Sequence, residues 1–151
     1  MADVFTKQKR SELMARIKSR GNRKTELALL VILRQNHLTG WRRHLRVIGR
    51  PDFAFVKPKV AVFVDGCFWH ACPRCASRPA SNRLFWEIKL ATNVRRDRIV
   101  NRALKAKGWR IIRIWQHELK RPGRVAKKLC RALSLVPSDA TPAEGGKIPD
   151  R

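Results

Sequence analysis

The chain has 151 residues, of which 44% are apolar, so it is long enough to bury a hydrophobic core as one domain. Lysine and arginine number 35 against 11 acidic residues, and the net charge of +24 indicates a polyanionic partner such as nucleic acid. The polar start from Met1 to Met14 argues against a secretory signal, and no apolar run approaches the ~20 residues of a membrane span, so we expect a cytoplasmic protein.

The N-terminal part of the chain is predicted to be helical after a short arm. Residues 1–10 have the composition of a flexible basic arm, and Ser11 can cap a short helix over residues 12–18. Asn22 is a candidate cap for a second helix over residues 23–36. The centre of this second helix is apolar on nearly every side, which predicts that it is buried.

Three strands are predicted next. Residues 41–47 contain four basic or histidine side chains, which favours an exposed or edge strand. Residues 52–56 alternate in the manner of a strand, and a tight turn over residues 57–59 leads to a third one. Residues 60–64 are continuously apolar and rich in valine, which predicts a central strand covered on both faces.

The rest of the chain is predicted to continue with a long helix, a strand and a closing helix. The long helix begins at Ser81 or Asn82 and ends at Gly108, with a bend near residues 91–93. Residues 109–115 predict a second buried strand, with both of its tryptophans in the core. A helix over residues 124–133 closes the domain.

These elements predict an α/β fold, in which helices flank a mixed β-sheet and the active groups lie at strand ends. We divide the chain into a basic arm with a short helix (1–22), a main domain (23–135) and a tail (136–151). Proline, glycine, alanine and serine dominate the tail, so we expect it to be disordered.

A cysteine cluster follows the central strand. Cys67, Cys72 and Cys75 lie within nine residues, and in a reducing compartment such a cluster indicates zinc rather than disulfides. Zinc favours four tetrahedral ligands. The candidates for the fourth position are His70, His117 and Cys130. A lone cysteine on a helix is more often a small buried hydrophobe, which is what we expect of Cys130.

Two acids lie at the ends of the predicted strands. Pro51-Asp52 opens one strand and Asp65 ends the next, an arrangement typical of restriction-endonuclease-like nucleases, in which the acids hold Mg²⁺. Those enzymes place a lysine two residues after the second acid, where this chain has Cys67. Another group must therefore help to activate water, unless Asp52 is simply a turn residue.

The string Asp65-Gly66-Cys67-Phe68-Trp69-His70, with Gly49-Arg50-Pro51-Asp52-Phe53 upstream, resembles the very-short-patch-repair (Vsr) family of mismatch endonucleases. Further matching segments are Met1 to Val4, Phe85-Trp86, Asn93 to Arg98, and Gly108 to Arg110 leading to Ile114-Trp115. The resemblance extends over about residues 1–133.

The resemblance implies a restriction-endonuclease-like fold with a structural zinc ion. It also implies a Mg²⁺-dependent enzyme that nicks duplex DNA 5′ to the T of a T:G mismatch, in repair of deaminated 5-methylcytosine. The expected setting is the bacterial nucleoid, with a functional link to a DNA cytosine methyltransferase, no membrane, and a monomeric protein.

The resemblance also assigns roles to individual residues. It implies that Asp52 and the backbone carbonyl of Val64 bind Mg²⁺, with Asp65 as a direct or water-mediated ligand. It implies that His70 activates water, because a histidine titrates near neutral pH. Two further acids, Glu26 and Asp97, would orient metal-bound water or His70. The zinc ligands it implies are Cys67, Cys72, Cys75 and His117.

Aromatic side chains form the last set of candidates. The resemblance implies that Phe68, Trp69 and Trp86 intercalate at the mismatch and that Met14 inserts from the minor-groove side. The alternative is that Phe68 and Trp69 only pack locally over zinc. We expect His37 and His44 to be solvated and assign them no role.

Two other functions are compatible with the pattern. The first is a related nickase or restriction-like nuclease that does not require a mismatch. The second is a zinc-bearing DNA-binding module without catalysis. Such a module has no need of the catalytic set Asp52, Asp65, His70, Glu26 and Asp97, all of which are present.

Overall fold

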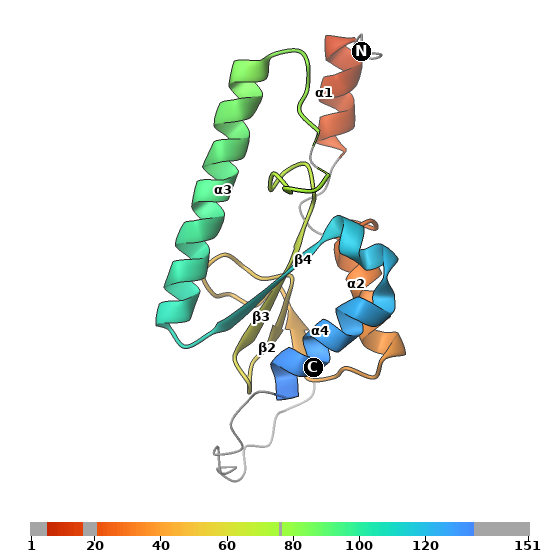
Figure 1. The fold of residues 1–151 in the computed structure, drawn as a ribbon, viewed down its shortest axis with the longest axis vertical. Helices are drawn as coiled ribbons and strands as arrows, with labels where there is room; N and C mark the ends of the chain where they lie inside the picture. Colours follow the sequence, from red (N-terminus) through yellow and green to blue (C-terminus); the bar gives the residue numbers. More distant parts are fainter. Residues whose placement is uncertain (1–5, 17–20, 76, 135–151) are drawn as a thin grey trace.

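The computed structural model describes residues 6–16, 21–75 and 77–134. Its elements are α1 (Lys7–Ala15), α2 (Glu26–Gln35), β1 (Trp41–Arg43), β2 (Phe53–Phe55), β3 (Val60–Asp65), α3 (Arg83–Ala106), β4 (Arg110–Trp115), the 3₁₀ turn η1 (Gln116–Lys120) and α4 (Pro122–Ser134). One sheet has the strand order β1-β2-β3-β4, antiparallel between β1, β2 and β3 and parallel between β3 and β4. The predicted mixed α/β architecture is confirmed (Figure 1).

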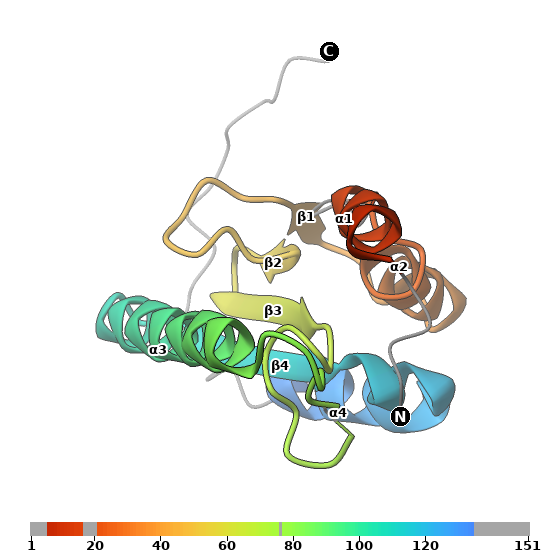
Figure 2. The same ribbon diagram turned by 90° about the horizontal axis from the view of Figure 1, so that it is seen from above.

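Helices cover both faces of the sheet. The α3 helix lies on one face, and α2 and α4 lie on the other (Figure 2). The larger hydrophobic cluster joins α2 and α4 to the sheet, with Leu29, Phe53 and Ile114 fully buried. The smaller cluster joins α3 to the opposite face through Leu104 and Phe63. A sheet buried on both faces requires strands that are apolar throughout, and this is why β3 has no alternation of polar residues.

The first helix begins earlier than the sequence predicted. It starts at Lys7, because Thr6 is its cap and accepts a hydrogen bond on Oγ1 from the Lys9 backbone N–H at 3.3 Å. Ser11 therefore lies inside the helix, and residues 7–10 are not part of a flexible arm. The predicted helix end at residue 18 lies outside the described residues.

The second helix is shorter than predicted, and Asn22 does not cap it. The Asn22 Oδ1 atom accepts from the Lys24 backbone N–H at 2.9 Å, and its carbonyl accepts from Leu27 N–H at 3.0 Å. These bonds close a turn ahead of α2, which begins only at Glu26. The turn matters for the site because it delivers the buried Glu26 to the first helical position.

The first strand ends at Arg43 and not at residue 47 as predicted. His44 has a φ of 50°, a left-handed conformation that a strand cannot continue through. The chain then turns back through residues 45–52, and the His44 N–H donates to the Asp52 carbonyl at 3.3 Å. Because of this turn, the His44 side chain is directed at the acids described below.

The C-terminal half follows the prediction with three corrections. The α3 helix is continuous through residues 91–93, where a bend was expected. Trp109 precedes β4, and it and Trp115 are half-buried, so neither is a fully buried core residue. Cys130 is exposed on α4, because the buried face of that helix passes through Val125 and Leu129. No described helix is long and apolar enough to span a membrane, and the predicted tail lies outside the described residues.

Candidate active site and metal cluster

The β2–β3 hairpin brings Asp52 to the end of the sheet at which β3 finishes. Asp52 directly precedes β2, and the antiparallel register pairs Phe53 with Val62. Its Oδ2 atom accepts a hydrogen bond from the Val64 backbone N–H at 2.8 Å. In an antiparallel pair the N–H and C=O of one residue face the same neighbour, so the Val64 carbonyl is directed to the Asp52 side as well.

Asp52 lies in an environment that disfavours its negative charge. Burial raises the pKa of its carboxyl from 3.8 to about 6, and the negative charges of Glu26 and Asp65 add to the effect against the Val64 hydrogen bond. A bound cation would reverse this balance by supplying positive charge. The local electrostatics therefore fit a divalent metal ion at Asp52.

Glu26 is a fully buried acid with a complete set of partners. It accepts from the Gly21 N–H at 2.6 Å, from Arg43 Nε at 2.8 Å, and lies 2.8 Å from His44 Nε2. Burial alone would raise the pKa of Glu26, but the hydrogen bonds from Gly21 and Arg43 and the charges of His44 and Arg43 outweigh it and lower the pKa. Glu26 is therefore ionised.

Glu26, His44 and Asp52 together form a second possible ligand group. One donor atom from each lies within 4.8 Å of the others. The expectation that His44 is solvated is wrong, because the side chain is half-buried beside Glu26. Sequence reasoning also did not identify Arg43 as a partner of Glu26. Their position became visible only once the backbone turned at residue 44.

Asp65 ends β3 and is held by an arginine of the neighbouring strand. Arg113 Nη1 donates to both carboxylate oxygens of Asp65, at 2.8 and 2.9 Å. Asn101 on α3 fixes the other side of the guanidinium, accepting from Nε at 3.1 Å and from Nη2 at 3.0 Å. Asp65 is 3% exposed, so this pairing compensates a charge that water cannot reach. Sequence reasoning missed Arg113 and Asn101, because they approach from a different strand and helix.

His70 lies between two acids. Its Nδ1 atom is 2.6 Å from Asp97 Oδ2 and 3.8 Å from Asp65 Oδ1. Burial by itself would lower the pKa of His70, but the hydrogen bond to Asp97 and the two carboxylate charges outweigh it and raise the pKa. The same bond, with the charges of His70 and Arg113, lowers the pKa of Asp97 against the effect of burial. The imidazole is thus oriented, with Nε2 as its remaining proton-exchanging atom.

The cysteine cluster forms at the end of β3. A tight turn, in which Cys72 N–H donates to the Cys67 carbonyl at 2.9 Å, folds the loop back on itself. His117 in η1 completes the group: its Nδ1 lies 3.3, 3.6 and 3.4 Å from the Sγ atoms of Cys67, Cys72 and Cys75. Ligands of one tetrahedral zinc ion are roughly 3.5–3.8 Å apart, as its bond lengths require. The donor set and its spacing fit zinc, and His70 is not part of it.

Four rings cluster beside this loop. Phe68 packs edge-on against Trp69 and against Trp86, each with ring centroids 5.2 Å apart, and Phe85 packs against Trp86 at 5.3 Å. Phe85 is 60% exposed, and the other three rings are half-buried. Asn93 on α3 is buried and donates to the Trp69 carbonyl at 3.0 Å, which fixes the loop to the helix. Met14 is half-buried on α1.

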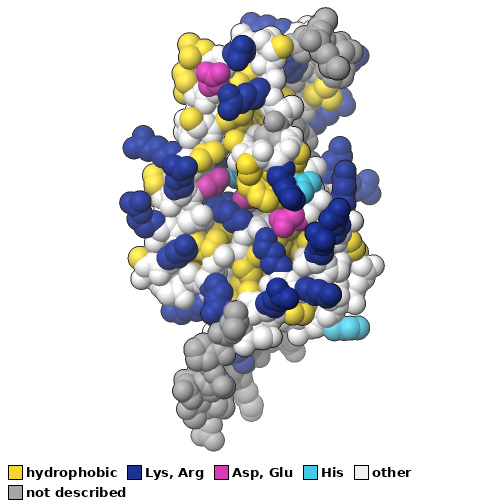
Figure 3. All heavy atoms as spheres, in the orientation of Figure 1, with side chains coloured by type: hydrophobic (Ala, Val, Ile, Leu, Met, Phe, Trp, Pro, Cys, Tyr) yellow, Lys and Arg dark blue, Asp and Glu magenta, His cyan; other side chains and the backbone are white. Residues whose placement is uncertain are grey.

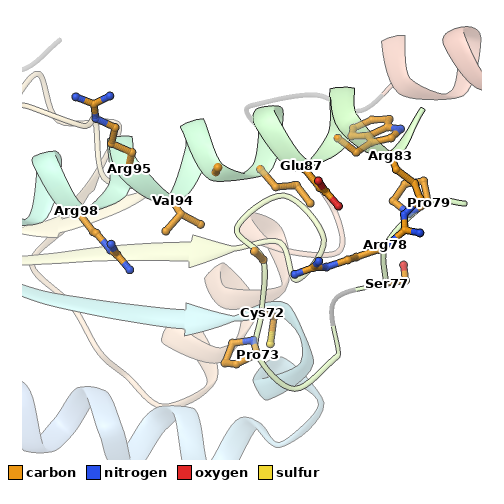
Figure 4. Close-up of a pocket in the computed structure, with 14 residues that line it drawn as sticks. Cys72, Pro73, Ser77, Arg78, Pro79, Arg83, Glu87, Val94, Arg95 and Arg98 are labelled. Atoms are coloured by element: carbon orange, nitrogen blue, oxygen red, sulfur yellow. The ribbon is translucent and has the colours of Figure 1, made fainter. Parts of the chain in front are cut away.

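A cavity of about 570 Å³ opens between the cysteine loop and α3, next to Trp86. Figure 4 shows arginines from both elements at this cavity. They are Arg78, Arg83, Arg95 and Arg98. With Glu87 as the acid among the lining residues, the cavity is cationic and suited to a phosphate group.

Comparison with known proteins points to one family. The sequence model of the family "DNA mismatch endonuclease Vsr" matches residues 2–76. The type II nicking enzyme V.NmeDIP of Neisseria meningitidis serogroup C is 39% identical over 119 residues, which cover 78% of this chain and 80% of that enzyme. DNA mismatch endonuclease Vsr of Escherichia coli K12 is 34% identical over 121 residues, covering 80% of this chain and 77% of that enzyme. The type II nicking enzyme V.NaeI of Lentzea aerocolonigenes is 52% identical over 69 residues, which span 42% of its length.

Proposed function

The chain belongs to the Vsr family of DNA mismatch endonucleases and is a DNA endonuclease, and we propose that it nicks one strand of duplex DNA 5′ to the T of a T:G mismatch. The observation that carries the proposal is the convergence of Asp52, Asp65 and the His70–Asp97 pair at one end of the sheet. The aromatic cluster of Phe68, Trp69 and Trp86 borders His70 in the chain and supplies the means of recognising a weakened base step.

We propose Mg²⁺ as the catalytic ion, with Asp52 and the Val64 carbonyl as its protein ligands. The raised pKa of Asp52 supports this assignment, since burial and the negative charges of Glu26 and Asp65 outweigh the Val64 hydrogen bond and the charge of His44. When bound, Mg²⁺ neutralises charge on the scissile phosphate and lowers the pKa of water. Asp65 is engaged by Arg113 through both oxygens, so we propose that it acts on the ion through water and not directly.

We propose His70 as the general base. Its Nε2 accepts a proton from the attacking water, while Asp97 holds Nδ1 and stabilises the imidazolium that forms. The water oxygen forms a bond to phosphorus as one P–O ester bond breaks, and the leaving oxygen takes up a proton from solvent water to become a hydroxyl. Glu26, ionised and buried beside Asp52, orients water at the metal.

The proposal also includes the fold family, the structural metal ion and the oligomeric state. We propose a restriction-endonuclease-like fold, supported by the mixed four-stranded sheet with acids at the start of β2 and the end of β3. We propose structural zinc at Cys67, Cys72, Cys75 and His117, supported by their mutual distances. A monomer that acts after a DNA cytosine methyltransferase is part of the same proposal.

A second candidate is a nickase without a mismatch requirement, which the names of the type II nicking relatives favour. Both candidates predict one cut strand and differ in the duplex they accept.

The endonuclease proposal is tested with a T:G duplex labelled separately on each strand. In Mg²⁺ we expect cleavage of the T-containing strand at one position, an intact complementary strand, and no cleavage in EDTA. Cleavage of both strands, or activity in EDTA, would contradict the proposal. Asp52→Asn serves as the control for contaminating nucleases.

A further inference from the structure

The last helix of the domain carries a continuous cationic face. Its members recur at intervals of three and four residues and are all exposed: Arg124, Lys127, Lys128 and Arg131. This spacing places them on one side of the helix. The opposite side, through Val125 and Leu129, is buried against the sheet, so the orientation of the cationic face is fixed by the core.

This face borders a groove along β4, the outermost strand of the described sheet on this side. The groove, of about 660 Å³, runs between α4 and β4, where Arg110 and Arg113 add two further cations. β4 is an edge strand, and the Arg110 N–H donates to the Lys59 carbonyl on the β3 side at 2.8 Å. Backbone groups alternate along a strand, so those of Ile111 and Arg113 are directed at the groove.

The charged side chains among the described residues that line the groove are all cationic. None of the described residues that line it is acidic. The nearby Glu118 lies 3.4 Å from Lys128 through Oε1, while its Oε2 accepts from the Trp115 N–H at 2.7 Å. Glu118 thus pairs with Lys128, one of the cations on the exposed side of α4.

Two of the cations are already held in place by backbone carbonyls. Lys128 Nζ donates to the Arg113 carbonyl at 2.8 Å, and Arg110 Nη1 donates to the Ala132 carbonyl at 2.5 Å. These bonds tie α4 to the strand and fix the walls of the groove. Ordered walls reduce the entropy lost when a ligand binds.

Arg113 links the groove to the active site. It is one of the lining residues and accepts from Lys128 on its carbonyl, while its side chain holds Asp65. Figure 3 shows Lys and Arg side chains gathered over α4 on the same face of the molecule as acidic side chains. A polyanion lying on this face can therefore contact the cations over α4.

We infer that the α4–β4 groove binds the sugar–phosphate backbone of duplex DNA away from the nicked step, as a contact that does not depend on sequence or mismatch. The inference rests on the proposed DNA endonuclease function. Arg124 and Arg131, the first and last cations of the stripe, are seven steps apart along the helix, or about 10 Å. One DNA strand carries a phosphate about every 3.4 Å along the helix axis. The stripe can thus face about three successive phosphates.

A chain with a charge of +24 binds DNA through many cations, so the test must compare variants of equal charge. The groove variant is Arg124→Gln, Lys127→Gln and Arg131→Gln, which leaves Lys128 and Arg110 in their structural bonds. The matched control, Arg34→Gln, Lys57→Gln and Lys105→Gln, removes three exposed cations from α2, the β2–β3 turn and α3. Circular dichroism and melting establish that both variants fold.

The measurement is the affinity for a matched duplex over a series of KCl concentrations. Each lost phosphate contact should reduce the slope of log K against log salt by about 0.9. We expect a reduction of about 2 to 3 for the groove variant and little change for the control. An unchanged slope for the groove variant, or equal reductions in both, would overturn the inference.

The outcome is independent of the nicking assay, because binding to a matched duplex needs neither metal nor mismatch. A reduced slope in a chain that does not nick T:G duplexes would overturn the proposed function and leave the groove intact. Nicking that persists with an unchanged slope would do the reverse.

Discussion

Nδ1 of His70 lies 2.6 Å from Oδ2 of Asp97, which joins the loop after β3 to the middle of α3. A carboxylate at this distance fixes both the tautomer and the direction of the ring. Asp97, and not the cysteine cluster, therefore orients the imidazole of His70, although His70 lies in the loop that carries the cysteines.

The contact between His70 and Asp97 predicts different losses of nicking rate when each residue is replaced. His70→Ala should reduce the single-turnover nicking rate by ~10²–10⁴-fold, the range of a general base. Asp97→Asn should lower the rate less, because the imidazole keeps its place in the loop but loses its orienting charge. A normal rate in His70→Ala would remove His70 from the mechanism.

The ionised carboxylate of Asp52 is predicted to lower the free energy of unfolding at neutral pH, although catalysis requires it. Its pKa is raised to about 6, so the folded state binds a proton that the unfolded state releases near pH 4. Stability from this group is present at low pH and is lost as pH rises toward 6, a difference of about 3 kcal/mol. Asp52→Asn should therefore abolish nicking while it raises the unfolding free energy by about 1–3 kcal/mol at neutral pH and hardly at all near pH 4.

Denaturant unfolding of both proteins at the two pH values, without divalent metal, measures this difference. Mg²⁺ should stabilise the wild-type chain and leave Asp52→Asn unaffected. If the variant is less stable at neutral pH, the carboxylate is already compensated and the argument for a cation at Asp52 fails.

The metal cluster gives a third prediction. His117→Ala should lose zinc and unfold at a lower temperature, because the loop from Cys67 to Cys75 has little core of its own. His70→Ala should retain one zinc ion per chain, since Nδ1 of His70 is bonded to Asp97. Metal analysis of both variants checks the assignment, and the opposite pattern would show that His70 is the fourth ligand.

The rings provide a fourth prediction. Phe68→Ala with Trp69→Ala should weaken binding to a T:G duplex by ~1–3 kcal/mol for each lost stack and barely change binding to the matched duplex. The reason is that stacking requires an opened step, whereas the basic surface binds either duplex. Zinc content is the control, because Phe68 follows Cys67. Equal losses on both duplexes with zinc retained would mean that the rings are structural.

The sequence predicted most of the fold because local patterns determine it. The continuous apolar run at 60–64 was sufficient to identify a central strand, and the order of strands and helices followed. The predicted starts of α1 and α2 were wrong, because a different side chain, or a different bond of the predicted one, satisfied the backbone N–H groups there. Thr6 capped α1 ahead of Ser11, and Asn22 closed a turn in place of a cap.

The residues of the candidate site also fall into two groups, those that the sequence identified and those that it did not. Asp52, Asp65 and the cysteines lie at strand ends and are visible in the chain, whereas Arg113 and His44 reach the acids only through tertiary structure. The left-handed conformation of His44 has no signal in the residue itself. When the partner of an acid comes from another strand or loop, it can be identified only after the fold is known.

The most direct test of the proposed function is the ratio of single-turnover nicking rates on T:G and T:A duplexes of one sequence, in Mg²⁺ at moderate salt. The duplexes share their phosphates, so the basic surface contributes equally to both and the ratio reports only the mismatched step. We predict that the T-containing strand of the T:G duplex is nicked at least ~100-fold faster, since the softer step lowers the cost of opening by a few kcal/mol. Equal rates on the two duplexes would contradict mismatch recognition and would assign the chain to the nickases that accept paired DNA.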